Sequence, residues 1–155
     1  MATRELLVVI LNHTNEELDL EPESPSLEHG QWMDTPESRP PTEILAGESG
    51  MLRCNSSHIG AGVGGSVTYR VIGYKTNHKV TFLWSIPYVG QNKFDCLCTA
   101  EGFRVRVLGG KGNQPVVVFV FEPAQSPSLD HSVAAALTKG PVACAQAPVG
   151  SLTHY

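Results

Sequence analysis

The sequence lacks long apolar runs and lacks an extended helical repeat. No stretch approaches the roughly 20 consecutive apolar residues of a membrane-spanning helix, so membrane contact must be peripheral or made by a rearranged or oligomeric form. The first 120 residues or so show no long apolar pattern of period 3.6. With 15 glycines and 11 prolines in the chain, many short strands joined by turns are predicted instead.

Cysteine and histidine are present, but not in the spacings of a metal site. Cys96 and Cys98 have neither a CxxC partner nor a histidine pair at ligand spacing, so we predict no metal ligand and no cofactor. Free thiols in a reducing compartment are the default, with a Cys54–Cys96 or Cys54–Cys98 disulfide as the alternative. The six histidines are scattered, without a nucleophile elbow, and the chain is therefore predicted not to be an enzyme.

No secretory signal is evident at the N-terminus. The apolar run 6–11 is short and is not followed by a small-residue cleavage site. We expect a protein that is secreted without a recognisable signal peptide, or held in the cytoplasm until release, and that associates peripherally with membranes.

The net charge of −4 is unevenly divided along the chain. Residues 1–65 hold eleven acidic and three basic residues, whereas residues 66–111 hold two acidic and seven basic residues. Such asymmetry suits a surface that meets phosphate head groups, or charges that complement one another within one solvated domain. The acidic total and the lack of a known module disfavour nucleic acid as a partner.

A length of 155 residues fits one domain with a real core. The β-branched run 6–11 predicts a central strand buried on both faces. Residues 21–41 contain five prolines and predict an extended surface loop, in which Trp32 is either a lid over the core or an exposed contact residue. Strands are predicted over 6–11, 18–20, 44–45, 51–54, 66–72, 79–86, 93–96, 103–108 and 115–121. The fold class is therefore predicted as all-β, a single β-sandwich over residues 5–122.

Residues 123–155 differ in composition and form a predicted tail rich in proline, alanine and serine. A proline near the start of 127–139 and a glycine after it are typical of a short helix. The rest of the tail carries too little bulky apolar surface to offset the entropy of ordering it, which predicts disorder.

The stretch 81–96 carries the strongest functional signal. Pro87 has no N–H and should end the strand that contains Trp84, so 88–92 should leave the sheet as a loop carrying Tyr88 beside Lys93. Aromatic rings with a polar group suit the interfacial layer of a membrane. Trp84 is either such a contact or a core residue of an ordinary sheet.

A series of short motifs follows in order along residues 5–121. They are Leu11-Asn12, Gly30-Gln31-Trp32, Ala46-Gly47-Glu48 before Cys54, Gly64-Gly65 before Tyr69, Trp84 with Pro87-Tyr88, and Asn92 to Asp95. Their order and spacing resemble those of the aegerolysins, small all-β haemolysin-like proteins. Ile86 and Tyr88 stand where that family typically has cysteine and a second tryptophan, and Leu6-Leu7 stand where it has a tryptophan.

The version Trp-Ser-Ile-Pro-Tyr at 84–88 is also similar to the actinoporins, pore-forming toxins that share this sandwich topology. That family holds phosphocholine with a serine, proline and aromatic region. Its long amphipathic N-terminal helix, which builds the pore, has no counterpart in this chain.

The two resemblances imply a cytolysin-like protein that binds a sphingolipid head group. The lipid would be sphingomyelin or ceramide phosphoethanolamine. The chain would be the targeting component of a two-component pore-forming toxin, with a perforin-like protein or a homo-oligomer as its partner. The implied lipid-binding residues are Trp84, Ser85, Pro87, Tyr88, Lys93, Tyr69, Trp32 and Lys79. The alternative function is a lectin-like sandwich that binds glycan or protein, because exposed aromatic rings also stack on sugars.

Overall fold

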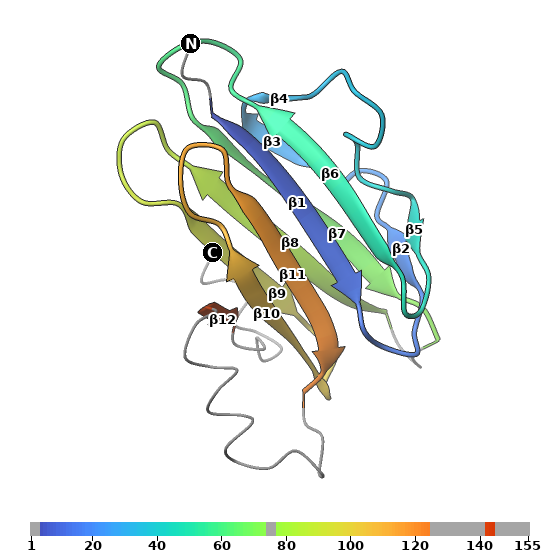
Figure 1. The fold of residues 1–155 in the computed structure, drawn as a ribbon. Helices are drawn as coiled ribbons and strands as arrows, with labels where there is room; N and C mark the ends of the chain where they lie inside the picture. The colour runs from blue at the N-terminus through green and yellow to red at the C-terminus, as the bar shows by residue number, and fades with distance from the viewer. Residues whose placement is uncertain (1–3, 74–76, 125–141, 145–155) are drawn as a thin grey trace.

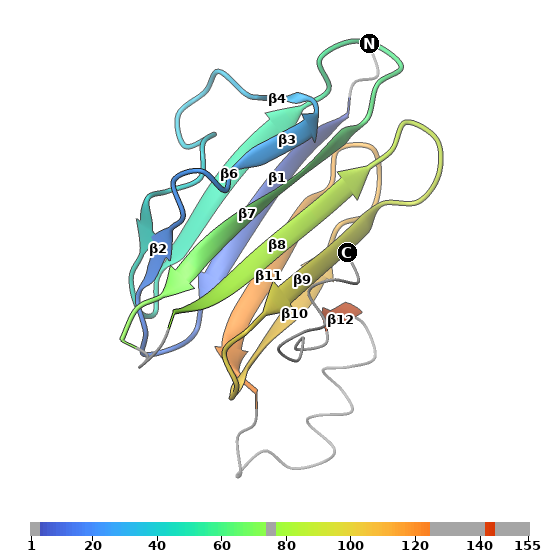
Figure 2. The ribbon, with the colours of Figure 1, turned by 180° about the vertical axis from the view of Figure 1, so that it is seen from behind.

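The protein is described here by a computed structural model, which covers residues 4–73, 77–124 and 142–144. Two six-stranded sheets lie face to face (Figure 1). Sheet A has the order β12 (Val142–Cys144), β10 (Phe103–Gly109), β11 (Val116–Pro123), β1 (Glu5–Asn12), β6 (Ser49–Asn55) and β4 (Gln31–Trp32). Sheet B, in front in Figure 2, has the order β5 (Glu43–Ile44), β2 (Leu18–Leu20), β7 (Val63–Val71), β8 (His78–Ile86) and β9 (Lys93–Cys98), with β3 (Ser26–His29) also paired to β7. The predicted all-β sandwich is confirmed.

The core lies between the two sheets and follows the alternation of each strand. In β1 the side chains of Leu6, Val8 and Ile10 are buried against sheet B, while the residues between them are half-buried. The prediction that this strand is central is confirmed, because it lies between β6 and β11. The prediction that β1 is buried on both faces was wrong. Its inner face is buried, whereas the side chains on its outer face are only half-buried.

The pairing of β1 with β11 is parallel, with Leu7 opposite Val116. Parallel strands begin at the same edge of a sheet. The residues before β1 and the loop before β11 therefore meet at one end of the sandwich, although they are far apart in the sequence.

Two elements differ from the sequence-based expectation of loops. Residues 21–41 contain β3 and β4, short strands that fit between the prolines. The glycine-rich loop ends earlier than predicted, because β7 already begins at Val63. A Cβ at Gly65 would collide with the Ser26 carbonyl oxygen and with Leu27, so glycine is what allows β3 to approach this strand.

In the region predicted as a tail, β12 adds a short strand to the edge of β10. The predicted helix over 127–139 lies outside the described residues, and the division of the chain after residue 122 stays a prediction. Among the described residues, no helix has the length and apolar character needed to cross a membrane.

Asn12 closes one end of the sandwich. Its side chain is fully buried, and Nδ2 lies 2.7 Å from the Glu16 carbonyl oxygen and 3.1 Å from each of the carbonyl oxygens of Ile44 and Leu45. Thr14 donates from its hydroxyl to Asn12 Oδ1 at 2.6 Å. Buried polar groups are stable only when paired in this way, so the network fixes the turns at this end, which we call the closed end.

Candidate functional site

Trp84 lies in the core. It is 3% exposed, because alternation along β8 turns it inward together with Phe82 and Ile86. Trp32 is half-buried and packs edge-on against it, with ring centroids 6.5 Å apart. The expectation that Trp84 contacts lipid directly is therefore corrected to the alternative of a core residue, and Trp32 covers the core as a lid.

Tyr69 is also buried, and its hydroxyl donates to the Pro41 carbonyl oxygen at 2.8 Å. Burial raises the pKa of this phenol well above its usual range. The ring therefore anchors the connection before β5 and presents no surface to a ligand, which corrects its assignment as a lipid-binding residue.

Lys79 lies near the start of β8, whereas Tyr88 follows the end of that strand. The Lys79 ammonium is 3.6 Å from Glu21, which also pairs with Arg70 at 2.9 Å. A nine-residue strand spans roughly 25–30 Å, so Lys79 cannot share a site with Tyr88, and its assignment to one is corrected.

Ser85 and Lys93 are opposite each other on β8 and β9 and are exposed on the outer face of sheet B. They line a shallow depression of about 210 Å³ together with Ser66, Asp95 and Glu28. This polar depression is separate from the loop that carries Tyr88.

The predicted loop after Pro87 is present. β8 ends at Ile86, and the loop 87–92 carries Tyr88 at 41% exposure and Val89 at 84%. The prediction of a proline-terminated strand followed by an exposed ring is confirmed for Tyr88.

Arg4 holds this loop from the other side. Its Nη2 donates to the Tyr88 carbonyl oxygen at 2.7 Å, and its guanidinium lies 4.6 Å from the centroid of the Tyr88 ring. This contact was not predicted, because the two residues are 84 positions apart and meet only where the two sheets pack face to face, Arg4 before β1 of sheet A and Tyr88 after β8 of sheet B.

A cleft of about 520 Å³ separates the loop 87–92 from the turn 109–113, and Arg4 and Lys111 both line it. Asn92 donates from Nδ2 to the carbonyl oxygens of Gly110 and Gly112, at 2.8 Å each. Gly110 has a φ of +94° and lies directly against the Phe94 ring, where a Cβ would collide. These contacts fix the turn beside the loop, so that the cleft is part of the folded structure.

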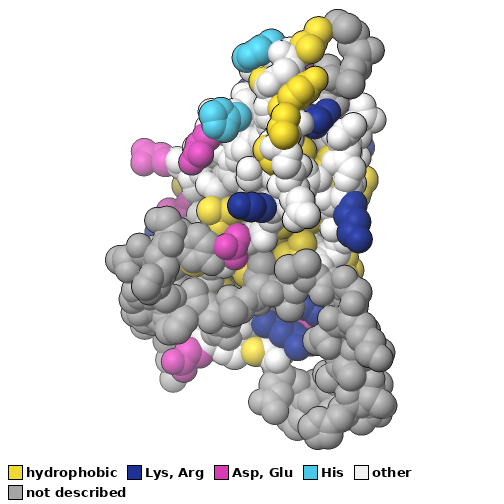
Figure 3. All heavy atoms as spheres, turned by 90° about the vertical axis from the view of Figure 1, so that its left-hand side faces the viewer, with side chains coloured by type: hydrophobic (Ala, Val, Ile, Leu, Met, Phe, Trp, Pro, Cys, Tyr) yellow, Lys and Arg dark blue, Asp and Glu magenta, His cyan; other side chains and the backbone are white. Residues whose placement is uncertain are grey.

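A third loop completes this end of the molecule. Ile59 is 57% exposed in the loop 56–62, and Gly62 packs against the backbone of 86–88. Ser56 donates from its N–H to the Arg4 carbonyl oxygen at 2.8 Å. Figure 3 shows hydrophobic side chains gathered at this end, near histidine and basic side chains. We call the loops 56–62, 87–92 and 109–113, together with Arg4, the loop end.

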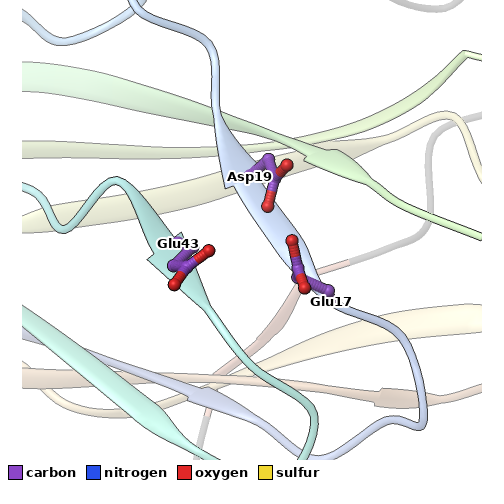
Figure 4. A group of neighbouring side chains, drawn as sticks. All are labelled: Glu17, Asp19 and Glu43. Atoms are coloured by element: carbon purple, nitrogen blue, oxygen red, sulfur yellow. The ribbon is translucent and has the colours of Figure 1, made fainter.

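Three carboxylates meet near the closed end, as Figure 4 shows. Glu17, Asp19 and Glu43 bring oxygens within 4.8 Å of one another, because β2 pairs with β5 and places Asp19 opposite Glu43. A hydrogen bond with Asp19, followed by partial desolvation and the neighbouring negative charges, raises the pKa of Glu17. This group was not predicted from the cysteine and histidine spacings, because its three members are carboxylates.

Comparison with known proteins finds a shared fold and no family. No family model matches the chain, and no curated protein matches it. Among solved structures, the lipid binding protein Nakanori is similar, with a TM-score of 0.65 over 77% of this chain and 71% of that one. The two sequences are 12% identical, so the likeness establishes the β-sandwich fold alone.

Proposed function

We propose that the protein binds peripherally to the surface of lipid membranes through its loop end. The observation that carries the proposal is the coincidence of three exposed apolar side chains, Ile59, Tyr88 and Val89, with the basic residues Arg4 and Lys111. Apolar and aromatic side chains enter the interfacial layer, and cations beside them are attracted to lipid phosphates.

The two contributions are of similar size. Burying one such apolar side chain yields about 1.5–3 kcal/mol, and each basic residue near an anionic surface adds about 1 kcal/mol. Insertion and charge are therefore both needed for firm binding, and a fitted head group must supply the selectivity. The shared fold with a protein that is itself described as lipid binding supports this proposal.

The resemblance to the aegerolysins extends the proposal to a lipid class. In this form, the loop end recognises a sphingolipid such as sphingomyelin or ceramide phosphoethanolamine, and the chain directs a perforin-like partner or its own oligomer to the membrane. A panel of vesicles with and without each sphingolipid tests the lipid class, and leakage of a trapped dye with the chain alone tests whether a partner is required.

Vesicle sedimentation with matched variants tests the membrane-binding surface. Val89→Asp places a charge at the most exposed apolar position of the loop end, and it should weaken binding at least tenfold, which corresponds to about 1.4 kcal/mol. Leu45→Asp makes the same change at the closed end, where Leu45 is 40% exposed, and should leave binding unchanged. Equal binding by the two variants would contradict the proposed surface.

A glycan-binding function is the second candidate. The depression on sheet B offers the hydroxyl groups of Ser66 and Ser85 and the carboxylate of Asp95 on one open face. Hydrogen-bonding groups of this kind can orient a sugar. Saturable binding on a glycan array that is lost in Ser85→Tyr, without sedimentation on any vesicle, would favour this candidate.

A further inference from the structure

We infer that the cleft at the loop end selects lipids by an anionic phosphate group and not by a choline ammonium. The inference rests on the proposed function and adds to it the chemistry of the head group. It depends on the pairing of the charges, the position of Arg4, and the positions of the aromatic rings.

The cleft brings two basic side chains together without an acidic residue among the described residues that line it. Four basic side chains elsewhere are paired with glutamates: Arg70 and Lys79 share Glu21, and Arg104 and Arg106 share Glu122. Within the described residues, Arg4 and Lys111 have no carboxylate partner, and no aspartate or glutamate lines the cleft. The cleft is therefore a concentration of positive charge that its own walls do not compensate.

The Arg4 side chain is held in place and still has N–H donors that can bind a ligand. A guanidinium carries five N–H donors in a fixed plane, and the structure uses one of them on the Tyr88 carbonyl oxygen. The contact with the Tyr88 ring fixes the plane of the group. A planar, pre-positioned guanidinium matches the oxygens of a phosphate, which it can contact with two parallel hydrogen bonds.

Lys111 lies on the opposite wall of the cleft, in a turn whose backbone is held in place. The two hydrogen bonds from Asn92 hold the carbonyl groups on both sides of Lys111, and Phe94 supports Gly110 from below. Phe94 itself contacts Phe119 of the core, with ring centroids 6.3 Å apart. The two cations therefore line one cleft on separately anchored loops.

An ammonium site would require exposed aromatic faces. Quaternary ammonium groups are recognised by cages of aromatic rings. Trp84 and Tyr69 are buried, and the Gly110 turn covers part of the Phe94 ring. The exposed ring of Tyr88 already has the Arg4 guanidinium against its face. A choline group placed there would meet a positive charge, so the cleft favours the phosphate part of a head group.

Vesicles of defined charge test the inference. We expect the wild-type protein to sediment more strongly with phosphatidylcholine vesicles containing phosphatidic acid than with phosphatidylcholine alone. Lys111→Gln and Arg4→Gln should each weaken binding to the phosphatidic acid vesicles by about fivefold, from one cation per substitution. Arg4→Lys, which keeps the charge but not the planar group, should recover part of the loss.

Arg39→Gln is the matched control, because Arg39 is exposed on the connection between β4 and β5, away from the cleft. It removes the same charge and should leave binding unchanged. Equal losses in Arg39→Gln and Lys111→Gln would overturn the inference, and so would equally tight binding to phosphatidylcholine alone. Circular dichroism and urea unfolding establish that each variant is folded.

A soluble phosphate separates this inference from the proposed function. Glycerol 3-phosphate should shift the amide resonances of the turn 109–113 in the wild-type protein and not in Lys111→Gln. If these shifts occur but no vesicle binds, the phosphate site stands and the membrane function fails. If vesicles bind through Val89 but neither phosphatidic acid nor glycerol 3-phosphate has an effect, the membrane function stands and the inference fails.

Discussion

The two ends of the sandwich use the same kinds of side chain for different purposes. At the closed end, Asn12 is buried and binds three carbonyl groups, and the nearby cations of Arg70 and Lys79 are paired with Glu21. At the loop end, Asn92 fixes the wall of an open cleft, and the cations that line it have no acidic partner among the described residues. Polar groups that are satisfied internally stabilise the fold, whereas those left unpaired beside apolar tips are available to a ligand.

Trp84 and Tyr88 lie within five residues of each other, yet one ring is buried and the other is exposed. Substituting them should give the largest difference in stability between two variants. Trp84→Ala removes a buried ring between two sheets and should lower the free energy of unfolding by about 3–5 kcal/mol. Tyr88→Ala removes a ring that is 41% exposed, and should leave unfolding nearly unchanged while weakening vesicle binding. Urea denaturation combined with sedimentation measures both effects. A folded Trp84→Ala protein of normal stability that no longer binds vesicles would reverse the two roles.

The two asparagines give the next largest contrast. Asn12→Ala leaves buried carbonyl groups without a donor and should cost about 2 kcal/mol or more, since each unpaired buried group costs about 1–3 kcal/mol. Asn92→Ala removes bonds at a partly exposed position and should cost about 1 kcal/mol. It should nevertheless weaken binding to phosphatidic acid vesicles, because the turn that carries Lys111 loses its attachment. Loss of binding in Asn12→Ala alone, at a temperature where both variants are folded, would contradict the division between the ends.

Strand positions could be predicted from the sequence because they depend on local patterns. Alternation and turn residues located nine of the strands, and Pro87 correctly marked the end of one. The short strands β3 and β4 were missed because five prolines surround them, and β12 was missed because the composition of its region resembles a disordered tail.

The candidate site was less predictable, because it depends on contacts between distant residues. Tyr88 was identified correctly as exposed, since the proline places it outside the sheet. Alternation along β8 predicts that Trp84 shares a face with Phe82 and Ile86. It does not predict which face is buried, because that depends on the position of the opposite sheet. Arg4 could not be predicted as part of the site, because its contact with Tyr88 requires the packing of sheet A against sheet B.

Releasing the paired cations at the closed end tests whether charge alone attracts the membrane. Glu21→Gln frees Arg70 and Lys79, and it should change stability by less than about 1 kcal/mol, because exposed ion pairs contribute little. Binding should not rise by more than about twofold at physiological salt, where exposed charges are screened within about 8 Å. A gain as large as the loss in Lys111→Gln would show that unpaired charge is sufficient without the apolar tips. Sedimentation of the two variants on the same vesicles provides the measurement.

The smallest expected effect concerns the carboxylates near the closed end. The pKa of Glu17 is raised, chiefly by its hydrogen bond with Asp19, so the folded protein holds this proton more tightly than the unfolded chain does. Stability should therefore fall as the pH rises from the ordinary glutamate pKa of about 4.3 through the raised value of the folded state. Glu17→Gln removes the titrating group and should flatten this slope slightly, whereas Glu23→Gln, at an exposed position between β2 and β3, should not. Melting temperatures of the three proteins across the acidic range measure the difference, and identical profiles would mean that the carboxylates at this end do not interact in solution.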